Sequence, residues 1–381
     1  MINADVSGSD WIKPEVFDYL KQQFSEQRFG NPNSNHFIGN RLFQEIEMAR
    51  GTLCGVLSCD SHQLIFNGGA TEGIRNVFFS FFEHHSYQDA VILHSPYEHS
   101  ATLENIRYCR AKGADSIVLA HEQNGLLDLA GLQAALKACQ GKAVLVAVMA
   151  AHNETGVIQD YQQIAELCHA YDAEYLCDTT QLIGKQSFDF ERSEVDYAVA
   201  SGHKFGALPG TGFLLVKNSW HFSPLLLGGG QESSLRAGTQ NYLGIASMAI
   251  ALPLAHQRMA NQAEVTAVQR RFEQALKHHF PGTVIIGEAA PRVPGLTFCA
   301  IGGVSREALQ AVLEDARIMV SSGSACSDRK SALSKVATGL GYSDDVAKNT
   351  LRFSLGYSGT EAIYASLAET LRRVEPKALV A

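Results

Sequence analysis

The chain has 381 residues, of which 46% are hydrophobic and 18% charged, and 31 basic against 39 acidic side chains give a formal net charge of −8. This composition is too apolar for a disordered protein, and the chain is long enough for more than one hydrophobic core. Mild acidity without a long run of one sign argues against a surface built to coat nucleic acid or anionic lipid. We therefore expect a small-molecule enzyme that binds neither nucleic acid nor membranes.

Short apolar runs alternate with helical patterns over the first two thirds of the chain. After a helix near residues 14–27, strands are predicted at 64–67, 90–94, 116–120, 143–150, 174–177, 197–200 and 213–216. Apolar residues at three- and four-residue spacing predict helices at 129–138 and 164–171. Such alternation is typical of an α/β fold with a mostly parallel sheet and helices on both faces.

The pattern changes after Gly238. A long helical stretch over about 243–280 ends at Pro281 and Gly282, and such a helix usually bridges two domains. The remaining chain predicts a smaller α+β unit, with strands at 284–286, 296–300, 318–320 and 351–355 and helices at 305–316 and from 361 onward. We therefore expect a large domain over 15–250 and a small domain made of 1–14 and 251–381.

A glycine turn, Asn67-Gly68-Gly69-Ala70-Thr71-Glu72-Gly73, joins the first strand of the sheet to an apparent helix start. Backbone N–H groups in such a turn, together with the Thr71 hydroxyl, could cradle a phosphate. The alternative is that Thr71 only caps the helix, with Glu72 in the first turn. The turn alone does not decide between the two.

Two later strand ends carry charged side chains. Asp178 ends a buried strand, where its carboxylate needs a partner such as a protonated ring nitrogen, unless it only caps the next turn. Lys204 follows another apolar strand in the loop Ser201-Gly202-His203-Lys204. Burial lowers a lysine pKa and makes its amine a nucleophile toward an aldehyde, whereas a solvated loop lysine is the plainer alternative.

Cys326 differs from the other cysteines by its neighbours. Its small, mostly polar flank predicts an accessible loop in which a thiolate can form and react, whereas Cys168, Cys177 and Cys299 are expected to be buried hydrophobes. The eight cysteines are scattered singly, without a C-x-x-C pair, which indicates a reducing compartment. With no leader pattern at the start and no apolar run near ~18 residues, we expect a soluble cytoplasmic protein without a predicted metal site.

A series of segments resembles, in order, the motifs of the NifS/IscS-like cysteine desulfurases, pyridoxal-phosphate enzymes of the class V aminotransferase group. The segments are Phe29-Gly30-Asn31-Pro32-Asn33-Ser34-Asn35-His36, Gly69-Ala70-Thr71-Glu72, Glu98-His99, His152-Asn153-Glu154-Thr155-Gly156, Asp178-Thr179-Thr180-Gln181, Ser201-Gly202-His203-Lys204, Arg236-Ala237-Gly238-Thr239 and Arg352-Phe353-Ser354-Leu355-Gly356. This resemblance covers nearly the whole chain. It implies the PLP-dependent transferase fold type I, with a mostly parallel seven-stranded sheet in the large domain and a smaller α+β domain.

The resemblance also implies how the ring of pyridoxal 5'-phosphate would be held. Lys204 would form the Schiff base with the cofactor aldehyde, and Asp178 would pair with the pyridine nitrogen. Gln181 and Asn153 would contact the phenolic oxygen. His99 would stack on the ring and take part in proton transfers.

Further residues would hold the phosphate and the substrate. Arg352, with Asn153, would bind the substrate carboxylate, because a guanidinium forks onto a carboxylate. Thr239 would reach the phosphate of the neighbouring subunit, which implies a homodimer with shared active sites. The phosphate of the same subunit would be held by Ala70, Thr71, Ser201 and His203.

The implied reaction converts L-cysteine to L-alanine and leaves its sulfur on Cys326 as a persulfide for an acceptor protein. The stretch that ends at Cys326 resembles the branch serving iron–sulfur cluster assembly and tRNA thiolation. However, only one helix follows Gly356, whereas housekeeping members carry a longer tail, so a dedicated thiolation or DNA-phosphorothioation partner is a fair hypothesis. Residues 5–10 also depart from the alanine-threonine-threonine pattern of the family.

Other functions stay open on the sequence. A related aminotransferase or lyase acting on another small amino acid would need the same cofactor site, with Cys326 incidental. An inactive relative that serves as an interaction subunit would need neither the cofactor site nor Cys326. In that case Arg352 could pair with an internal acid, and His99 or His203 could be ordinary core histidines.

Overall fold

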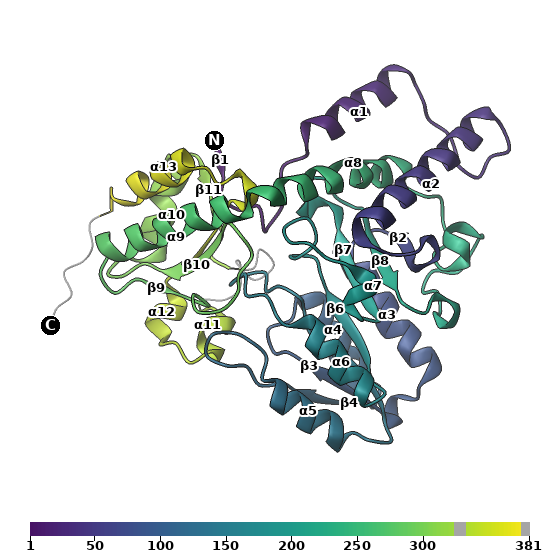
Figure 1. The fold of residues 1–381 in the computed structure, drawn as a ribbon, viewed down its shortest axis with the longest axis horizontal. Helices are drawn as coiled ribbons and strands as arrows, with labels where there is room; N and C mark the ends of the chain where they lie inside the picture. Colours follow the sequence, from purple (N-terminus) through teal and green to yellow (C-terminus); the bar gives the residue numbers. More distant parts are fainter. Residues whose placement is uncertain (324–332, 375–381) are drawn as a thin grey trace.

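The computed structural model describes residues 1–323 and 333–374, so Cys326 lies outside the described residues. Figure 1 shows two lobes, one formed by the purple to teal part of the chain and one by the light green to yellow part. The N-terminus lies in the second lobe, beside the C-terminal helix. Within the described ranges, no helix combines the length and apolar character needed to cross a membrane.

The first lobe is built on a seven-stranded sheet. In sequence its strands are β2 (Leu64–Asn67), β3 (Ala90–His94), β4 (Asp115–Val118), β5 (Ala143–Ala147), β6 (Glu174–Asp178), β7 (Tyr197–Ser201) and β8 (Gly212–Val216). Their spatial order is β2-β8-β7-β6-β5-β3-β4, and every pair is parallel except β2–β8 and β7–β8. The predicted α/β fold with a mostly parallel sheet is confirmed.

The direction of the strands places several strand ends at one edge of the sheet. Because β8 runs antiparallel to both β2 and β7, those two strands run in the same direction. Gly212 of β8 pairs with both Asn67 and Ser201, so the carboxyl ends of β2 and β7 lie level. The carboxyl ends of β3, β5 and β6 lie at the same edge, where ligands of α/β sheets collect.

Helices cover both faces of this sheet, because side chains alternate along each strand. On β3, Ile92 packs into one hydrophobic cluster and Val91 and Leu93 pack into the other. The cluster of Ile92 also contains α3 (Ala70–His84) and α4 (Ser100–Ala111). The opposite cluster contains residues of α2 (Phe37–Leu57), α5 (Leu129–Ala138), α6 (Tyr161–Ala170) and α8 (Tyr242–Arg258).

The second lobe has a three-stranded antiparallel sheet in the order β12-β10-β9, with its own hydrophobic core. The strands are β9 (Val284–Ile285), β10 (Leu296–Ala300) and β12 (Thr350–Ser354), and β1 (Ile2–Asn3) pairs separately with β11 (Ile318–Met319). The helices of this lobe are α9 (Gln262–His279), α10 (Arg306–Asp315), α11 (Lys335–Gly339), α12 (Asp344–Lys348) and α13 (Glu361–Leu371). An additional helix, α1 (Pro14–Ser25), lies near α8 at the first lobe (Figure 1).

The prediction of one helix over about 243–280 is wrong, because a short 3-10 turn at Met259–Asn261 separates α8 from α9. The two helices pack on different cores. Met248 of α8 belongs to the core of the first lobe, and Phe272 of α9 belongs to that of the second. The break therefore lies where the chain leaves one core for the other.

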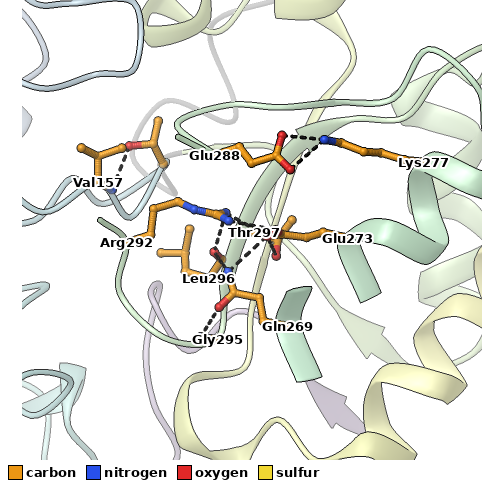
Figure 2. Close-up of polar contacts among 10 residues, drawn as sticks. Val157, Gln269, Glu273, Lys277, Glu288, Arg292, Gly295, Leu296 and Thr297 are labelled. Atoms are coloured by element: carbon orange, nitrogen blue, oxygen red, sulfur yellow. Dashed lines mark hydrogen bonds and ion pairs between the residues drawn. The ribbon is translucent and has the colours of Figure 1, made fainter. Parts of the chain in front are cut away.

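A polar network around Arg292 and Glu273 joins α9 to β10 within the second lobe (Figure 2). Both terminal nitrogens of Arg292 donate to the carboxylate of Glu273 at 2.8 Å, and the Thr297 hydroxyl donates to it at 2.7 Å. Arg292 also forms an isolated β-bridge with Val157 of the first lobe. Because Val157 directly follows the segment His152-Asn153-Glu154-Thr155-Gly156, this network holds one of the predicted site loops in place.

Candidate active site

A cavity of about 290 Å3 lies at the edge of the sheet where these strands end. Every predicted cofactor residue except Thr239 lines this cavity, and so does Arg352. Four strand ends, the start of α3 and strand β12 of the second lobe therefore meet at one place. The lining residues are Ser7, Gly8, Ala70, Thr71, His99, Met149, Ala151, Asn153, Asp178, Thr180, Gln181, Ser201, His203, Lys204 and Arg352.

Lys204 presents its amine to this cavity from the 3-10 turn Gly202–Lys204 that follows β7. Its Nζ donates to the carbonyl oxygens of Ser7 and Gly8, at 2.8 Å each. The N-terminal segment thus covers the lysine from the side of the second lobe. Sequence reasoning identified Lys204 but missed these contacts, because a backbone carbonyl carries no residue-type signal.

Asp178 is the last residue of β6, and His99 lies in the loop between β3 and α4. Asp178 is buried, and its Oδ1 accepts the backbone N–H of Thr180 at 2.9 Å. His99 caps α4, with Nδ1 accepting the N–H of Ala101 at 3.1 Å. Burial lowers the pKa of His99. The charge of Asp178 opposes this shift, and the charge of Lys204 lowers the pKa of His99 further. The ring is therefore neutral near pH 7 and carries its proton on Nε2.

The start of α3 forms an anion cradle. Its N-cap is Gly69, with φ 136°, a conformation that favours glycine, so Thr71 lies inside the helix and does not cap it. The N–H of Ala70 donates to the Ser201 hydroxyl at 2.9 Å, which joins the two cradle segments. Burial, with Lys204 and Lys185 adding, lowers the pKa of His203 to about 4, so this residue is neutral.

Gln181 is fixed by contacts on both sides of its amide. Its Nε2 donates to the carbonyl oxygen of Ser7 at 2.9 Å, and its Oε1 accepts a hydrogen bond from the amine of Lys185. Lys185 is buried beside the cavity and was not predicted as a site residue. Burial, with Lys204 and Arg352 adding, lowers the pKa of Lys185 to about 7, although Asp10 and Asp5 act in the opposite direction.

Arg352 reaches the cavity from β12 and is only 1% exposed. Its Nη1 donates to the carbonyl oxygen of Asn153 at 2.7 Å, and its Nη2 pairs with Oδ1 of Asp5 at 2.6 Å. Its Nε has no hydrogen-bond partner among the described residues. The guanidinium therefore has an internal acid as its counter-charge and one unsatisfied buried donor.

Among the described residues, Thr239 is the predicted site residue that does not line the cavity. Thr239 is exposed and borders a separate hollow together with Gly68 and Arg236. Cys326 is outside the described residues, but the segment before it is anchored at the site. Ser321 pairs with the backbone of Arg352, and a Cβ on Gly323 would lie 3.2 Å from the carboxylate of Glu154.

The shifted pKa of Lys185 makes the stability of the protein depend on pH. Between pH 7 and about 10 the unfolded chain keeps a proton on this lysine that the folded chain has lost, so folding becomes more favourable as pH rises. The slope for one such group is about 1.4 kcal/mol per pH unit. The free energy of unfolding of the wild type, compared with that of Lys185→Met, should therefore increase between pH 7 and 9. Urea unfolding midpoints of the two proteins measure this difference at each pH.

Lys137→Met, at an exposed position of α5, serves as the matched control and should show no such relative gain. A stability difference between wild type and Lys185→Met that stays constant from pH 6 to 9 would contradict the shift.

Comparison with known proteins agrees with this geometry. The family model of class-V aminotransferases matches residues 2–362. The cysteine desulfurase IscS of Escherichia coli O139:H28 is 30% identical over 377 residues, covering 98% of this chain and 92% of the relative. That of Serratia proteamaculans is 31% identical over 365 residues, covering 94% and 89%. The solved structure of a NifS-like protein matches with a TM-score of 0.88 at 27% identity, covering 98% of both chains.

A seven-stranded, mostly parallel sheet with a lysine, an acid and a phosphate-type cradle at its carboxyl edge defines a fold type I transferase. The chain belongs to the class-V aminotransferase family and, within it, to the NifS/IscS-like cysteine desulfurases.

Proposed function

We propose that this chain binds pyridoxal 5'-phosphate and acts as a cysteine desulfurase that converts L-cysteine to L-alanine and transfers the sulfur to Cys326 as a persulfide. The observation that carries the proposal is the meeting of Lys204, Asp178, Arg352 and the start of α3 in one cavity. An amine, a carboxylate, a guanidinium and an anion cradle are the partners that an aldehyde, a ring nitrogen, a substrate carboxylate and a phosphate require.

The residues present fit the cofactor. Lys204 would hold its aldehyde, the buried carboxylate of Asp178 would hold its ring nitrogen, and His99 would stack on the ring. Asn153 and Gln181 would contact its phenolic oxygen. When bound, the cofactor supplies an electron sink for bonds at the substrate α-carbon. The phosphate would be held by Ala70, Thr71, Ser201 and His203.

The side chains around the cavity would move protons at defined atoms. Once the Lys204 amine is released from the cofactor, Nζ would take the α-proton of the substrate. His99 would donate from Nε2, because its Nδ1 already accepts a backbone hydrogen bond. A thiol with an ordinary pKa near 8.5 is only partly ionised at neutral pH, so the Cys326 thiol must lose its proton before it attacks the substrate sulfur.

The substrate carboxylate would bind at Arg352 beside Asn153. Both residues are already joined, since Arg352 donates to the carbonyl oxygen of Asn153. The buried Nε of Arg352 is the donor that remains without a hydrogen bond among the described residues. An uncompensated buried donor costs free energy, so a carboxylate that reaches it is recognised strongly.

The decisive experiment determines which residue receives the sulfur atom of L-cysteine. After treatment with L-cysteine, the tryptic peptide 318–329, which contains only Cys326 as a thiol, should gain one sulfur atom in mass spectra. Cys326→Ala should keep the absorbance of bound cofactor but lose sulfide and alanine formation by about three orders of magnitude or more, because the acceptor nucleophile is gone. The peptide containing Cys139 should stay unmodified in both proteins.

Normal alanine and sulfide formation by Cys326→Ala would contradict the assignment. Transamination of a keto acid without sulfide release would instead favour the related aminotransferase.

We also propose that the enzyme is a homodimer in which Thr239 contributes to the active site of the partner. Two observations support this. Thr239 is exposed and lies outside the cavity of its own chain. In addition, α1 and α2 expose apolar side chains that a second copy would bury, including Phe17, Phe24, Phe37 and Met48. Sedimentation should give a dimer.

The sulfur acceptor is proposed to be a dedicated protein, as in thiolation or DNA phosphorothioation. A cytoplasmic location is proposed because all seven cysteines in the described ranges are free thiols, as expected in a reducing compartment.

A further inference from the structure

The end of α2 brings two cysteines together, on the side of the first lobe away from the residues of the active site. The helix stops at Leu57, and Ser58 adopts a left-handed conformation with φ 53°. This turn directs the N–H of Cys59 back to the carbonyl oxygen of Cys54, at 3.2 Å. This backbone hydrogen bond holds the two cysteines next to each other, and both line one surface cavity.

Both cysteines border a surface cavity large enough for small molecules. The cavity has a volume of about 440 Å3, and its other lining residues include Gly55, Asp60 and Lys217. Cys54 is 8% exposed, and Cys59 is partly exposed. This cavity shares no lining residue with the candidate active site.

The two thiols have unequal acidity. The hydrogen bond from Cys59 lowers the pKa of Cys54, and Arg50 lowers it further, although burial opposes both effects. The same hydrogen bond, together with burial, raises the pKa of Cys59. In contrast, burial raises the pKa of every other described cysteine: Cys109, Cys139, Cys168, Cys177 and Cys299. Cys54 is therefore the described thiol most readily ionised.

We propose that Cys54 and Cys59 form a dithiol site that a hydroperoxide oxidises to an intramolecular disulfide. The geometry favours the bond, because the turn hydrogen bond holds the two backbones together and both cysteines line the same cavity. The Cys54 thiolate attacks one peroxide oxygen and becomes a sulfenic acid, while the other oxygen leaves as water after taking a proton. The Cys59 thiol then attacks the Cys54 sulfur and displaces a second water.

In sum, two thiols and one hydrogen peroxide give one disulfide and two waters, so the peroxide takes up the two electrons that the thiols lose. The product closes a ring over residues 54–59 at the end of α2. This site is independent of the desulfurase reaction, because neither thiol touches the candidate active site.

The test uses the full-length protein, reduced and then treated with hydrogen peroxide in the absence of L-cysteine. After denaturation, alkylation and trypsin digestion, the peptide 51–75 holds both thiols and no other cysteine. In the oxidised protein this peptide should carry no alkyl group and should be two hydrogens lighter than the reduced, unalkylated peptide. Both thiols should become protected at least severalfold faster than Cys139, because the thiolate is the form that attacks the peroxide and Cys54 is the more acidic thiol. Cys326→Ala should behave like the wild type.

Two variants separate the steps. In Cys59→Ser, the sulfenic acid should accumulate on Cys54 and be trapped by a β-diketone, whereas in Cys54→Ser the Cys59 thiol should remain alkylatable. Equal loss of alkylation at Cys54, Cys59 and Cys139 would overturn the proposal, and so would a disulfide that fails to form in Cys326→Ala. Neither outcome bears on persulfide formation at Cys326, so the two proposals fail separately.

Discussion

Lys204→Ala is expected to abolish covalent attachment of the cofactor and to reduce turnover by about three orders of magnitude or more. The amine is both the proposed attachment point and the proposed base for the α-proton, whereas the amine of the nearby buried Lys185 donates to Gln181. Borohydride reduction of the wild type should fix the cofactor on a tryptic peptide spanning 193–217, which includes Lys204. The variant should yield no such adduct.

The matched control is Lys185→Met, which removes a buried lysine that donates to the cavity residue Gln181. It should still carry the adduct on Lys204, with the visible absorbance of the lysine-bound cofactor. An adduct that maps to Lys185 in the wild type, or an unchanged absorbance in Lys204→Ala, would show that the wrong amine was assigned.

Sequence patterns predicted the sheet well where strands are buried on both faces. The predicted range of β3 (Ala90–His94) agrees with the structure, because all five residues are buried and apolar patterning is uninterrupted. The prediction for β4 was displaced, because that edge strand is mostly exposed and lacks an apolar signal. Helix α2 was not predicted, since exposed Phe37, Phe43 and Met48 obscure its apolar stripe.

Within the site, the predictable residues are those placed at strand ends. Asp178 and Lys204 follow buried strands, and parallel strands bring such positions to one edge whatever the intervening sequence. The contacts of residues 5–10 were not predictable in this way. Asp5 and Arg352 are 347 positions apart, and nothing local to either residue indicates that Asp5 forms a β-bridge with Ser354 of β12 and an ion pair with Arg352.

The departure of residues 5–10 from the family pattern therefore matters for function. Asp5 places a carboxylate on the guanidinium that is proposed to bind the substrate carboxylate. Two carboxylates on one guanidinium repel each other. This repulsion weakens the binding of the substrate carboxylate to Arg352 but leaves the binding site in place. Arg352 should consequently make the site selective for substrates with a carboxylate. Asp5 should reduce the affinity of the site for these substrates.

Arg352→Met is expected to lower kcat/KM for L-cysteine by about 10^2- to 10^3-fold, equivalent to ~3–4 kcal/mol, because a buried charge-assisted pair with the substrate is lost. The Asp5 side chain is 27% exposed, so it can be hydrated in the variant and the fold should survive. Cofactor absorbance should not change. Initial rates over a range of L-cysteine concentrations measure the effect.

Asp5→Asn is the informative counterpart, because an asparagine oxygen still accepts the hydrogen bond from Arg352 but carries no charge. KM for L-cysteine should then fall by about two- to tenfold, with kcat little changed, since the substrate carboxylate no longer meets a like charge. A rise in KM would mean that the charge of Asp5 serves mainly to orient the guanidinium. If Arg352→Met left KM and kcat as they are, the substrate carboxylate would have to bind elsewhere in the cavity.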